Sequence, residues 1–499
     1  MRYRRKSLAK RALISSAIGA LTLTALASGA AHADPEPAKS LGFTPITTNA
    51  LPCSANGLMQ FANDAKNQPV VPTQLMQAGN PAMPVNAPAT SNMVGRANDM
   101  IAVTPDGHYL FTPSENSIPT ENGIGTDGSD GITRLTLKGP DAGKKEILAN
   151  DVDPVTGANL WQRVDGMKWY PSGGSGNHGV LLASEEFSPS STSAGGGIWQ
   201  IDADTGAFVR LDWLGNYAHE GIGLDQAGNL YLGDEFRGGA IYKAVPNDPK
   251  DLTQGGTLSY LVGTAIDASG WKQVTDAANA AAEATNGGAI LFDRPEDFDE
   301  ARGRVYFAVT EPAGDALLHT GGAGQVVNRG GVYSLTTTGV PNLSTQSGPS
   351  LPYTRLAPMI EVNDPTYANQ GQAQAQQGLQ FPDNLTFDTA GHLWVHEDIP
   401  DGSSFPTSGI DVSKQVRDQQ DELYVFVLNK QGDAVVPNGA STGPGLSGGY
   451  KVADMRTSPG AAGHPCENEF TGGIFSQDGK TLYINQQHWD SPTLAVDIG

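Results

Sequence analysis

A short unit made of a tight turn, an apolar strand and an acidic end recurs along this chain, and it limits the folds that are open to it. Its clearest copy is residues 381–398, where Asp388 to Gly391 is a turn signal and Leu393-Trp394-Val395 is a run of strand-forming residues. Glu397 and Asp398 follow where that strand should end. Further copies lie at residues 104–116, 178–186, 225–235, 302–311 and 478–488, the last of which ends in Gln487-His488.

The repetition predicts the fold class. A second strand signal follows the unit in most copies, and the copies recur at intervals of roughly 50 to 90 residues. Such a period is typical of a β-propeller, whereas a sandwich would not explain a repeated unit. The sequence therefore predicts an all-β protein, with a β-propeller of about six blades over residues 97–499. Loops interrupt the blades, and an Ala-rich run at 274–284 predicts a short helical insertion.

The first 33 residues have the features of an export signal. A basic segment precedes an apolar stretch rich in small residues, and Ala31-His32-Ala33 is a cleavage motif. Arg4-Arg5 indicates the twin-arginine route, with the general secretory route as the alternative. We therefore expect an exported protein, periplasmic or extracellular, followed by an irregular segment at 34–96. No later stretch reaches 18 apolar residues, so we expect no membrane span in the mature chain.

The net charge limits the binding partners of the protein, and the cysteine content limits its possible disulfides. The formal net charge is −22, from 31 basic and 53 acidic residues, which argues against nucleic acid as a partner. The acidity serves solubility, or some of the carboxylates hold cations. The two cysteines, Cys53 and Cys466, could form one disulfide in an exported protein. Alternatively Cys466, flanked by His464 and Glu467, could be a metal ligand.

The acidic ends of the repeated unit predict a metal site. In a propeller the corresponding strands of all blades surround a central channel, so equivalent strand ends converge. Carboxylates gathered there would repel one another unless cations relieve them. Carboxylate, amide and backbone oxygens suit Ca²⁺, and a mixture with His also suits iron or zinc. The alternative is a set of solvated acids that pair with Arg or cap turns.

Other polar groups stand just before the repeated strands. His219-Glu220, Asp383-Asn384 and Glu469 precede the third, fifth and sixth copies, and Glu296-Asp297 precede the fourth. Arg294 and Arg237 are the basic residues most closely surrounded by acids. Each could form a structural ion pair, or its guanidinium could bind an anionic oxygen of a substrate.

At these residues the sequence resembles the PhoX-type alkaline phosphatases, a family of exported propeller proteins. The matching motifs are His219-Glu220-Gly221, Gly233-Asp234-Glu235, Arg294-Pro295-Glu296-Asp297, Phe381-Pro382-Asp383-Asn384-Leu385 and Glu469-Phe470-Thr471-Gly472. The resemblance implies a six-bladed propeller that hydrolyses phosphomonoesters at a cluster of iron and calcium. The ligands it implies, without separating iron from calcium, are Glu185, Glu186, Glu220, Asp234, Glu235, Glu296, Asp297, Asp383, Asn384 and Glu397.

One departure from the family pattern bears on the metal content. PhoX-type phosphatases carry an iron-bridging Cys shortly before the first pair of glutamates, and residues 171–179 contain no Cys. A calcium-only or single-iron site (Ca²⁺ with or without Fe³⁺) therefore stays open, and His178 could replace the thiolate.

Three functions follow from these observations. The first is a metal-dependent phosphoric ester hydrolase, in which Arg294 or Arg237 would hold the phosphate of a small ester. The second is a calcium-dependent propeller lactonase or esterase with a carboxylate or His219 as the base. The third is a non-catalytic, calcium-stabilised propeller that binds a ligand, since fold alone does not decide function. We expect a monomer and no nucleotide cofactor, because no P-loop motif is present.

Overall fold

A computed structural model describes most of the repeat region of the chain. Residues 1–35 and 36–499 form two units, and everything described lies in the second. The described residues are 43–44, 46, 59–64, 66–77, 97–115, 131–150, 160–161, 163–171, 179–186, 196–264, 267–310, 325–327, 331–337, 354–355, 360–361, 379, 382–398, 422–428, 432, 450–454, 469–487 and 492–499.

The turn of the repeated unit forms as its composition predicts. Asp388 Oδ1 accepts hydrogen bonds from the backbone N–H groups of Ala390 and His392, each at 2.9 Å. Gly391 has a φ of +82°, a conformation that costs glycine little. An Asp side chain that satisfies its own turn in this way fixes where one strand ends and the next begins. Each copy of the unit is therefore the hairpin that joins the first two strands of one sheet.

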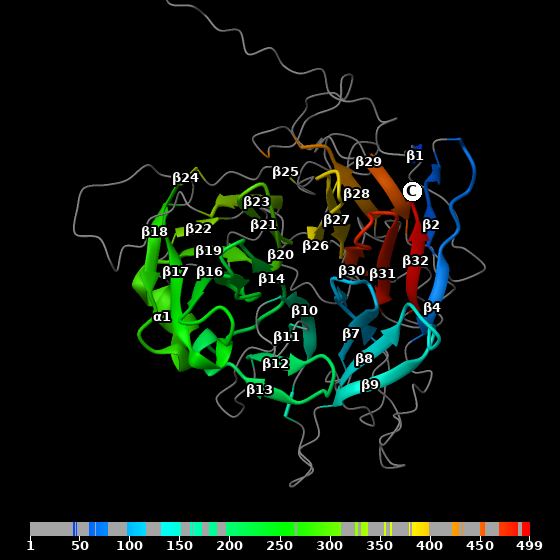
Figure 1. Ribbon diagram of the computed structural model, residues 1–499. Coiled ribbons are helices and arrows are strands. Elements are labelled where there is room, and N and C mark those ends of the chain that lie inside the picture. The colour runs from blue at the N-terminus through cyan, green and yellow to red at the C-terminus, as the bar shows by residue number, and fades with distance from the viewer. Residues whose placement is uncertain are drawn as a thin grey trace, which may run out of the picture. The chain divides into compact units, whose positions relative to one another are not determined.

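Six sheets built on these hairpins follow one another as blades of a propeller (Figure 1). The first is β5 (Ala97–Asn98), β6 (Ala102–Val103), β7 (Tyr109–Glu115), β8 (Gly131–Thr136) and β9 (Lys145–Asn150). The second is β10 (Val164–Tyr170), β11 (Val180–Glu185), β12 (Ile198–Asp202) and β13 (Phe208–Arg210).

The third blade is the largest, because strands from its insertion extend it. It contains β14 (Ile222–Leu224), β15 (Leu230–Gly233), β16 (Arg237–Pro246), β17 (Gly256–Thr264), β18 (Asp267–Gln273) and β24 (Thr354–Arg355), with β19 (Ile290–Asp293) and β22 (Gln325–Val327) joined through β16. The short helices described are η2 (Asp212–Leu214), η3 (Leu252–Gln254), η4 (Ala277–Asn279) and α1 (Ala280–Gly287). The last two form the helical insertion that the Ala-rich run predicted.

The remaining three blades complete the ring. The fourth is β20 (Pro295–Ala301), β21 (Arg304–Val309), β23 (Gly331–Thr336) and β25 (Ile360–Glu361). The fifth is β26 (Pro382–Phe387), β27 (Leu393–Glu397), β28 (Glu422–Phe426), β29 (Tyr450–Asp454) and β2 (Gln60–Phe61). The sixth is β30 (Glu469–Phe475), β31 (Thr481–Gln487), β32 (Pro492–Asp497) and β4 (Thr73–Gln77).

Short strands also lie within residues 34–96, the segment that was predicted to be irregular. Strand β4 pairs antiparallel with β32, so that Met76 lies opposite Thr493, and β2 pairs with β29. A two-stranded sheet joins β1 (Phe43–Thr44) to β3 (Asn63–Asp64). An N-terminal strand thus forms the outer edge of the last blade and links the two ends of the repeat region.

The core consists of apolar layers between successive blades. Along β11, Leu181 and Ala183 pack against the first blade, while Val180 and Leu182 pack against the third. This period of two is what a strand requires when both faces of its sheet are buried. Similar layers join each later blade to the next, and one joins the sixth blade back to the first. The predicted six-bladed propeller is therefore confirmed.

The first strand of each blade lies at the centre of the ring, where β20 contacts β14 and β26, and β26 contacts β30 (Figure 1). Side chains at equivalent heights on these strands are therefore brought together from distant parts of the sequence. Among the described residues, no helix has the length and apolar character needed to cross a membrane.

Candidate metal centre

Four of the innermost strands have a break in their hydrogen-bond register near their N-terminal ends. The register shifts between Val164 and Met167 in β10, between Pro295 and Phe298 in β20, between Pro382 and Leu385 in β26, and between Thr471 and Ile474 in β30. A bulge redirects side chains that regular pairing would alternate, and bulges are frequent next to functional sites. Asp165, Glu296-Asp297 and Asp383-Asn384 lie in these bulges, and Glu220 immediately precedes β14.

Glu220, Glu296 and Asp383 come together at this layer, which we call the acidic trio. One carboxylate oxygen from each lies within 4.8 Å of the others, and all three side chains are buried. The trio thus joins the third, fourth and fifth blades. Glycine allows this close approach: a Cβ on Gly166 would lie 1.8 Å from the carbonyl oxygen of Glu220.

Burial and mutual repulsion make the trio costly as three anions. Burial raises the pKa of Glu220 well above its usual range, and the charges of Glu296 and Asp383 raise it further. Burial also raises the pKa of Glu296 to about 7, although the neighbouring Arg294 lowers it. At neutral pH the trio therefore either retains protons or requires a cation.

The trio has the geometry and the acceptor atoms for a cation. Oxygen ligands of Ca²⁺ lie about 2.3–2.6 Å from the ion, so two ligands of one ion can be up to about 5 Å apart. The trio falls within that span. Glu296 Oε2 is buried and has no hydrogen-bond partner among the described residues, although its Oε1 accepts one from Thr310. An acceptor of this kind fits a metal ion, and the three residues could hold one.

A row of ion pairs lies beside the trio. Arg294 Nη2 is 2.8 Å from Glu235 Oε1, and its Nε is 3.1 Å from Glu296 Oε1. Arg163 Nη2 is 2.6 Å from Glu186 Oε2. Burial, followed by the charge of the neighbouring Glu186, raises the pKa of Glu235 well above its usual range. Two arginines therefore bracket two glutamates.

The comparison with known protein families identifies the family of this chain. The family model for "Alkaline phosphatase PhoX" matches residues 190–490, more than half of the chain. The chain belongs to the PhoX family. The resemblance inferred from the motifs is thereby confirmed.

One solved structure supports the fold. PhoX from Pseudomonas fluorescens, in complex with the transition-state analogue vanadate, is 17% identical, with 92% of this chain and 98% of that chain covered and a TM-score of 0.58. A gluconolactonase from Xanthomonas campestris is 11% identical, with 90% of this chain and 97% of that chain covered and a TM-score of 0.40. No curated protein sequence matches the chain.

Other residues implied by the PhoX resemblance lie in the same layer but contact the backbone. Asp297 accepts hydrogen bonds from the N–H groups of Phe298 at 2.6 Å and Leu385 at 3.0 Å. Asn384 Oδ1 accepts one from Gly472 at 2.7 Å. Asp297 therefore links β20 to β26, and Asn384 links β26 to β30.

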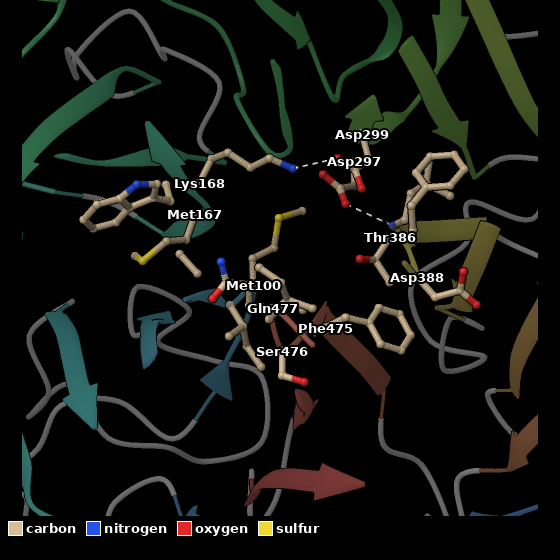
Figure 2. A pocket seen from close by; sticks show the side chains of 18 of the residues that line it. Met100, Met167, Lys168, Asp297, Asp299, Thr386, Asp388, Phe475, Ser476 and Gln477 are labelled. Carbon is tan, nitrogen blue, oxygen red and sulfur yellow. Dashed lines mark hydrogen bonds and ion pairs between the residues drawn. The ribbon is translucent and has the colours of Figure 1, made fainter. Parts of the chain in front are cut away.

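Asp297 also lines a cavity of about 350 Å³ toward the C-terminal ends of the innermost strands (Figure 2). Figure 2 shows Lys168 extended toward Asp297 and Asp299, and its Nζ lies 3.0 Å from Asp299 Oδ1. The apolar part of the lining includes Met100, Met167 and Phe475. In contrast to Glu296, both carboxylate oxygens of Asp297 accept a hydrogen bond from the backbone.

The acids that end the repeated strands hold their own blades together. Glu185 Oε2 accepts a hydrogen bond from the N–H of Gly197 at 2.9 Å, and Glu397 Oε2 accepts one from Glu422 at 3.1 Å. Each contact joins the second strand of a blade to the start of its third. In these contacts Glu185 and Glu397 help to hold the second and third strands of their blades together.

Asp234 and His219 lie in a different buried environment. Burial raises the pKa of Asp234 to about 7 and lowers the pKa of His219 to about 3, so the imidazole is neutral at physiological pH. The His219 ring lies against Tyr217, with ring centroids 3.7 Å apart and the ring planes tilted by 34°, and its Nε2 lies 3.3 Å from the Gly215 carbonyl oxygen. Through these contacts, the Nε2 of His219 has a carbonyl partner and one face of its ring is covered by Tyr217.

Some predicted residues lie outside the described residues. These are Cys53, Cys466, His178 and the side chain of Arg237, so the disulfide, the thiolate replacement and the second arginine stay predictions.

Sequence reasoning overlooked three buried or half-buried groups at the same layer: Arg163, Asp165 and Asp99. Asp165 contributes to the high pKa of Glu220, and Asp99 Oδ2 accepts a hydrogen bond from Gln487. The available signal was the spacing shared by Arg163-Val164-Asp165 and Arg294-Pro295-Glu296, an arginine two residues before an acid.

Proposed function

We propose that this protein is a metal-dependent phosphomonoesterase whose metal is held by Glu220, Glu296 and Asp383. The observation that carries the proposal is the buried trio, in which Glu296 Oε2 has no partner among the described residues. Membership of a family described as alkaline phosphatases supports the choice of substrate class, a small phosphate ester.

The donor set favours Ca²⁺. All three groups are carboxylates, which are hard oxygen ligands. Among the described residues, the group whose ligand atoms come together contains no histidine. Fe³⁺ is the alternative, because carboxylates also bind it. A cation held there would neutralise charge that develops on the phosphoryl oxygens.

The residues of this chain would orient the ester around that site. Arg294 is fixed by Glu235 and Glu296, and its side chain keeps 24% of its surface exposed. A guanidinium in this position can donate two parallel hydrogen bonds to a phosphoryl group. The buried carboxylates exclude bulk water, which strengthens each of these electrostatic contacts. Arg294 therefore has the role of a phosphate-binding residue in this proposal.

Metal content and hydrolysis, measured together on protein purified without chelators, test the function. We expect at least one equivalent of calcium per chain, and release of phosphate from p-nitrophenyl phosphate that stops on chelation and returns with added Ca²⁺. Stoichiometric iron would assign Fe³⁺ to the site. Calcium-dependent stability without hydrolysis of phosphate esters or lactones would instead support a calcium-stabilised binding propeller.

Export through the twin-arginine route and a monomeric state belong to the same proposal. Replacing Arg4 and Arg5 together by Lys should retain the precursor in the cytoplasm, since that route requires the arginine pair. Light scattering of the mature protein should give the mass of one chain.

A further inference from the structure

Phe236 is a large apolar side chain that the fold leaves in solvent beside the row of ion pairs. It is 60% exposed, and none of the described aromatic side chains forms a ring contact with it. The other large apolar residues that are exposed in the described part of the chain are Val71, Leu160, Val209 and Val245. Within this set Phe236 alone is aromatic, and it alone directly follows a member of the row, Glu235.

The backbone that carries Phe236 is held in a tight turn between β15 and β16. The carbonyl oxygen of Phe236 accepts a hydrogen bond from the N–H of Gly239 at 2.7 Å. A Cβ on Gly239 would lie 1.6 Å from the carbonyl oxygen of Asp234, so only glycine fits there. The aromatic ring is therefore presented to solvent from a backbone with little freedom, which reduces the entropy that a ligand contacting it would have to offset.

This turn adjoins Arg294. In the antiparallel pair of β16 with β19, Arg237 lies opposite Asp293, the last residue of β19. Because the two strands are antiparallel, the chain leaves this end of the ladder through Phe236 on one strand and Arg294 on the other. Phe236 and Arg294 are therefore neighbours at one end of these two strands.

The residue before Phe236 links the turn to the acidic trio. The N–H of Glu235 donates a hydrogen bond to the carbonyl oxygen of Ala218 at 2.9 Å, and Ala218 lies two residues before Glu220. The carboxylate of Glu235 lies 2.8 Å from Arg294. The turn that carries Phe236 is thus fixed between the segment that supplies a trio carboxylate and the arginine of the proposed phosphate site.

We infer that Phe236 packs against the leaving group of the ester, and that the preferred substrates have an aromatic leaving group, aryl or nucleoside. This inference rests on the proposed function. With the phosphoryl group held between the cation and Arg294, the rest of the ester extends to where Arg294 meets solvent, beside the exposed ring. An aromatic leaving group can stack on that ring, whereas a small alkyl group has no aromatic face to offer.

Binding of phenylphosphonate and methylphosphonate by calorimetry tests the inference without relying on turnover. The two ligands share the anionic group, differ in the group attached to it, and have no ester bond to hydrolyse. We expect the metal-loaded wild-type protein to bind phenylphosphonate about five- to tenfold more tightly, as an aromatic pair allows. Phe236→Ala should bring the ratio of the two Kd values close to 1 with unchanged metal content, and Phe236→Trp should restore the preference.

Val209→Ala is the matched control. Val209 is also an exposed apolar residue, at 43%, but it lies on β13, the outermost strand of the second blade. Its replacement should leave the ratio of the two Kd values unchanged. A wild-type ratio in Phe236→Ala, whether or not its melting temperature falls, would overturn the inference. A wild-type protein that binds the two phosphonates equally, or binds neither, would overturn it as well.

Hydrolysis of phenyl phosphate and of glycerol 2-phosphate separates the two proposals. If the wild-type protein prefers phenylphosphonate through Phe236 but hydrolyses neither ester, the phosphatase proposal fails and the aromatic contact stands. If it hydrolyses both esters and Phe236→Ala changes kcat/KM for both by the same factor, the phosphatase proposal stands and the role of Phe236 fails.

Discussion

Glu296 and Asp297 are neighbours in one bulge of β20, and their carboxylates have opposite surroundings. Glu296 lies in the acidic trio, and one of its oxygens has no partner among the described residues. Asp297 accepts two backbone hydrogen bonds and lies near Lys168. Two neighbouring acids therefore differ in how many hydrogen-bond donors surround them, and the proposed function assigns the metal to the one with fewer donors. The following changes test that assignment, beginning with the one expected to have the greatest effect.

The largest effect should come from Glu296→Gln. The amide keeps the shape of the side chain but removes a charge from the trio, so the metal should be lost and kcat/KM for p-nitrophenyl phosphate should fall about a thousandfold, or about 4 kcal/mol. Elemental analysis alongside the kinetics checks both effects. Glu300→Gln on the same strand is the control and should behave as wild type. Full metal occupancy in Glu296→Gln would contradict the assignment of Glu296 as a ligand.

Removing the metal should reveal the repulsion in the trio as a dependence of stability on pH. Because the folded-state pKa of Glu296 is about 7 against an ordinary 4.5, the folded state binds this proton more tightly than the unfolded state does. The chelated protein should therefore lose stability as pH rises from about 4.5 to above 7, by on the order of 3 kcal/mol from this residue. Urea unfolding at several pH values measures it. The slope should be smaller in chelated Glu296→Gln, and an equal slope in both proteins would contradict this origin.

Asp297→Asn should lower stability without removing metal. The new amide group would face one of the backbone N–H groups of Phe298 and Leu385 that Asp297 now satisfies, which costs about 1–3 kcal/mol. Urea unfolding and elemental analysis of the metal-loaded variant check this. Loss of metal comparable to that in Glu296→Gln would show that the two carboxylates act as one site and would end the comparison.

The smallest effect should come from Lys168→Gln in the cavity. The side chains of Lys168 and Asp299 are 28% and 20% exposed, and solvent weakens their 3.0 Å ion pair. We expect a change in unfolding free energy of about 1 kcal/mol or less, and no change in metal content or hydrolysis. A loss of hydrolysis comparable to that in Glu296→Gln would show that the cavity end takes part in the reaction.

Sequence reasoning reached the fold because the determinants of the fold are local. The Asp388 turn and the apolar run after it are readable within about ten residues, and repetition identifies the blades. The sequence also predicted the three residues of the trio, Glu220, Glu296 and Asp383, as metal ligands, because each lies in or next to an innermost strand. Neither the bulges nor the partners of each acid could be read, because both depend on strands that are distant in the sequence. Thr73–Gln77 was overlooked for the same reason, since its partner is β32.

The pairing of β4 with β32 also determines when the last blade can fold during synthesis of the chain. Residues Thr73 and Asp497 lie in adjacent strands of one sheet, so the last blade cannot be completed until nearly the whole chain has been synthesised. At about 5–20 residues per second, the N-terminal strand waits roughly 20–85 s with its edge unpaired. During that interval it is open to pairing with other chains. A shorter interval, or a chaperone that covers residues 73–77, should therefore raise the yield of folded protein.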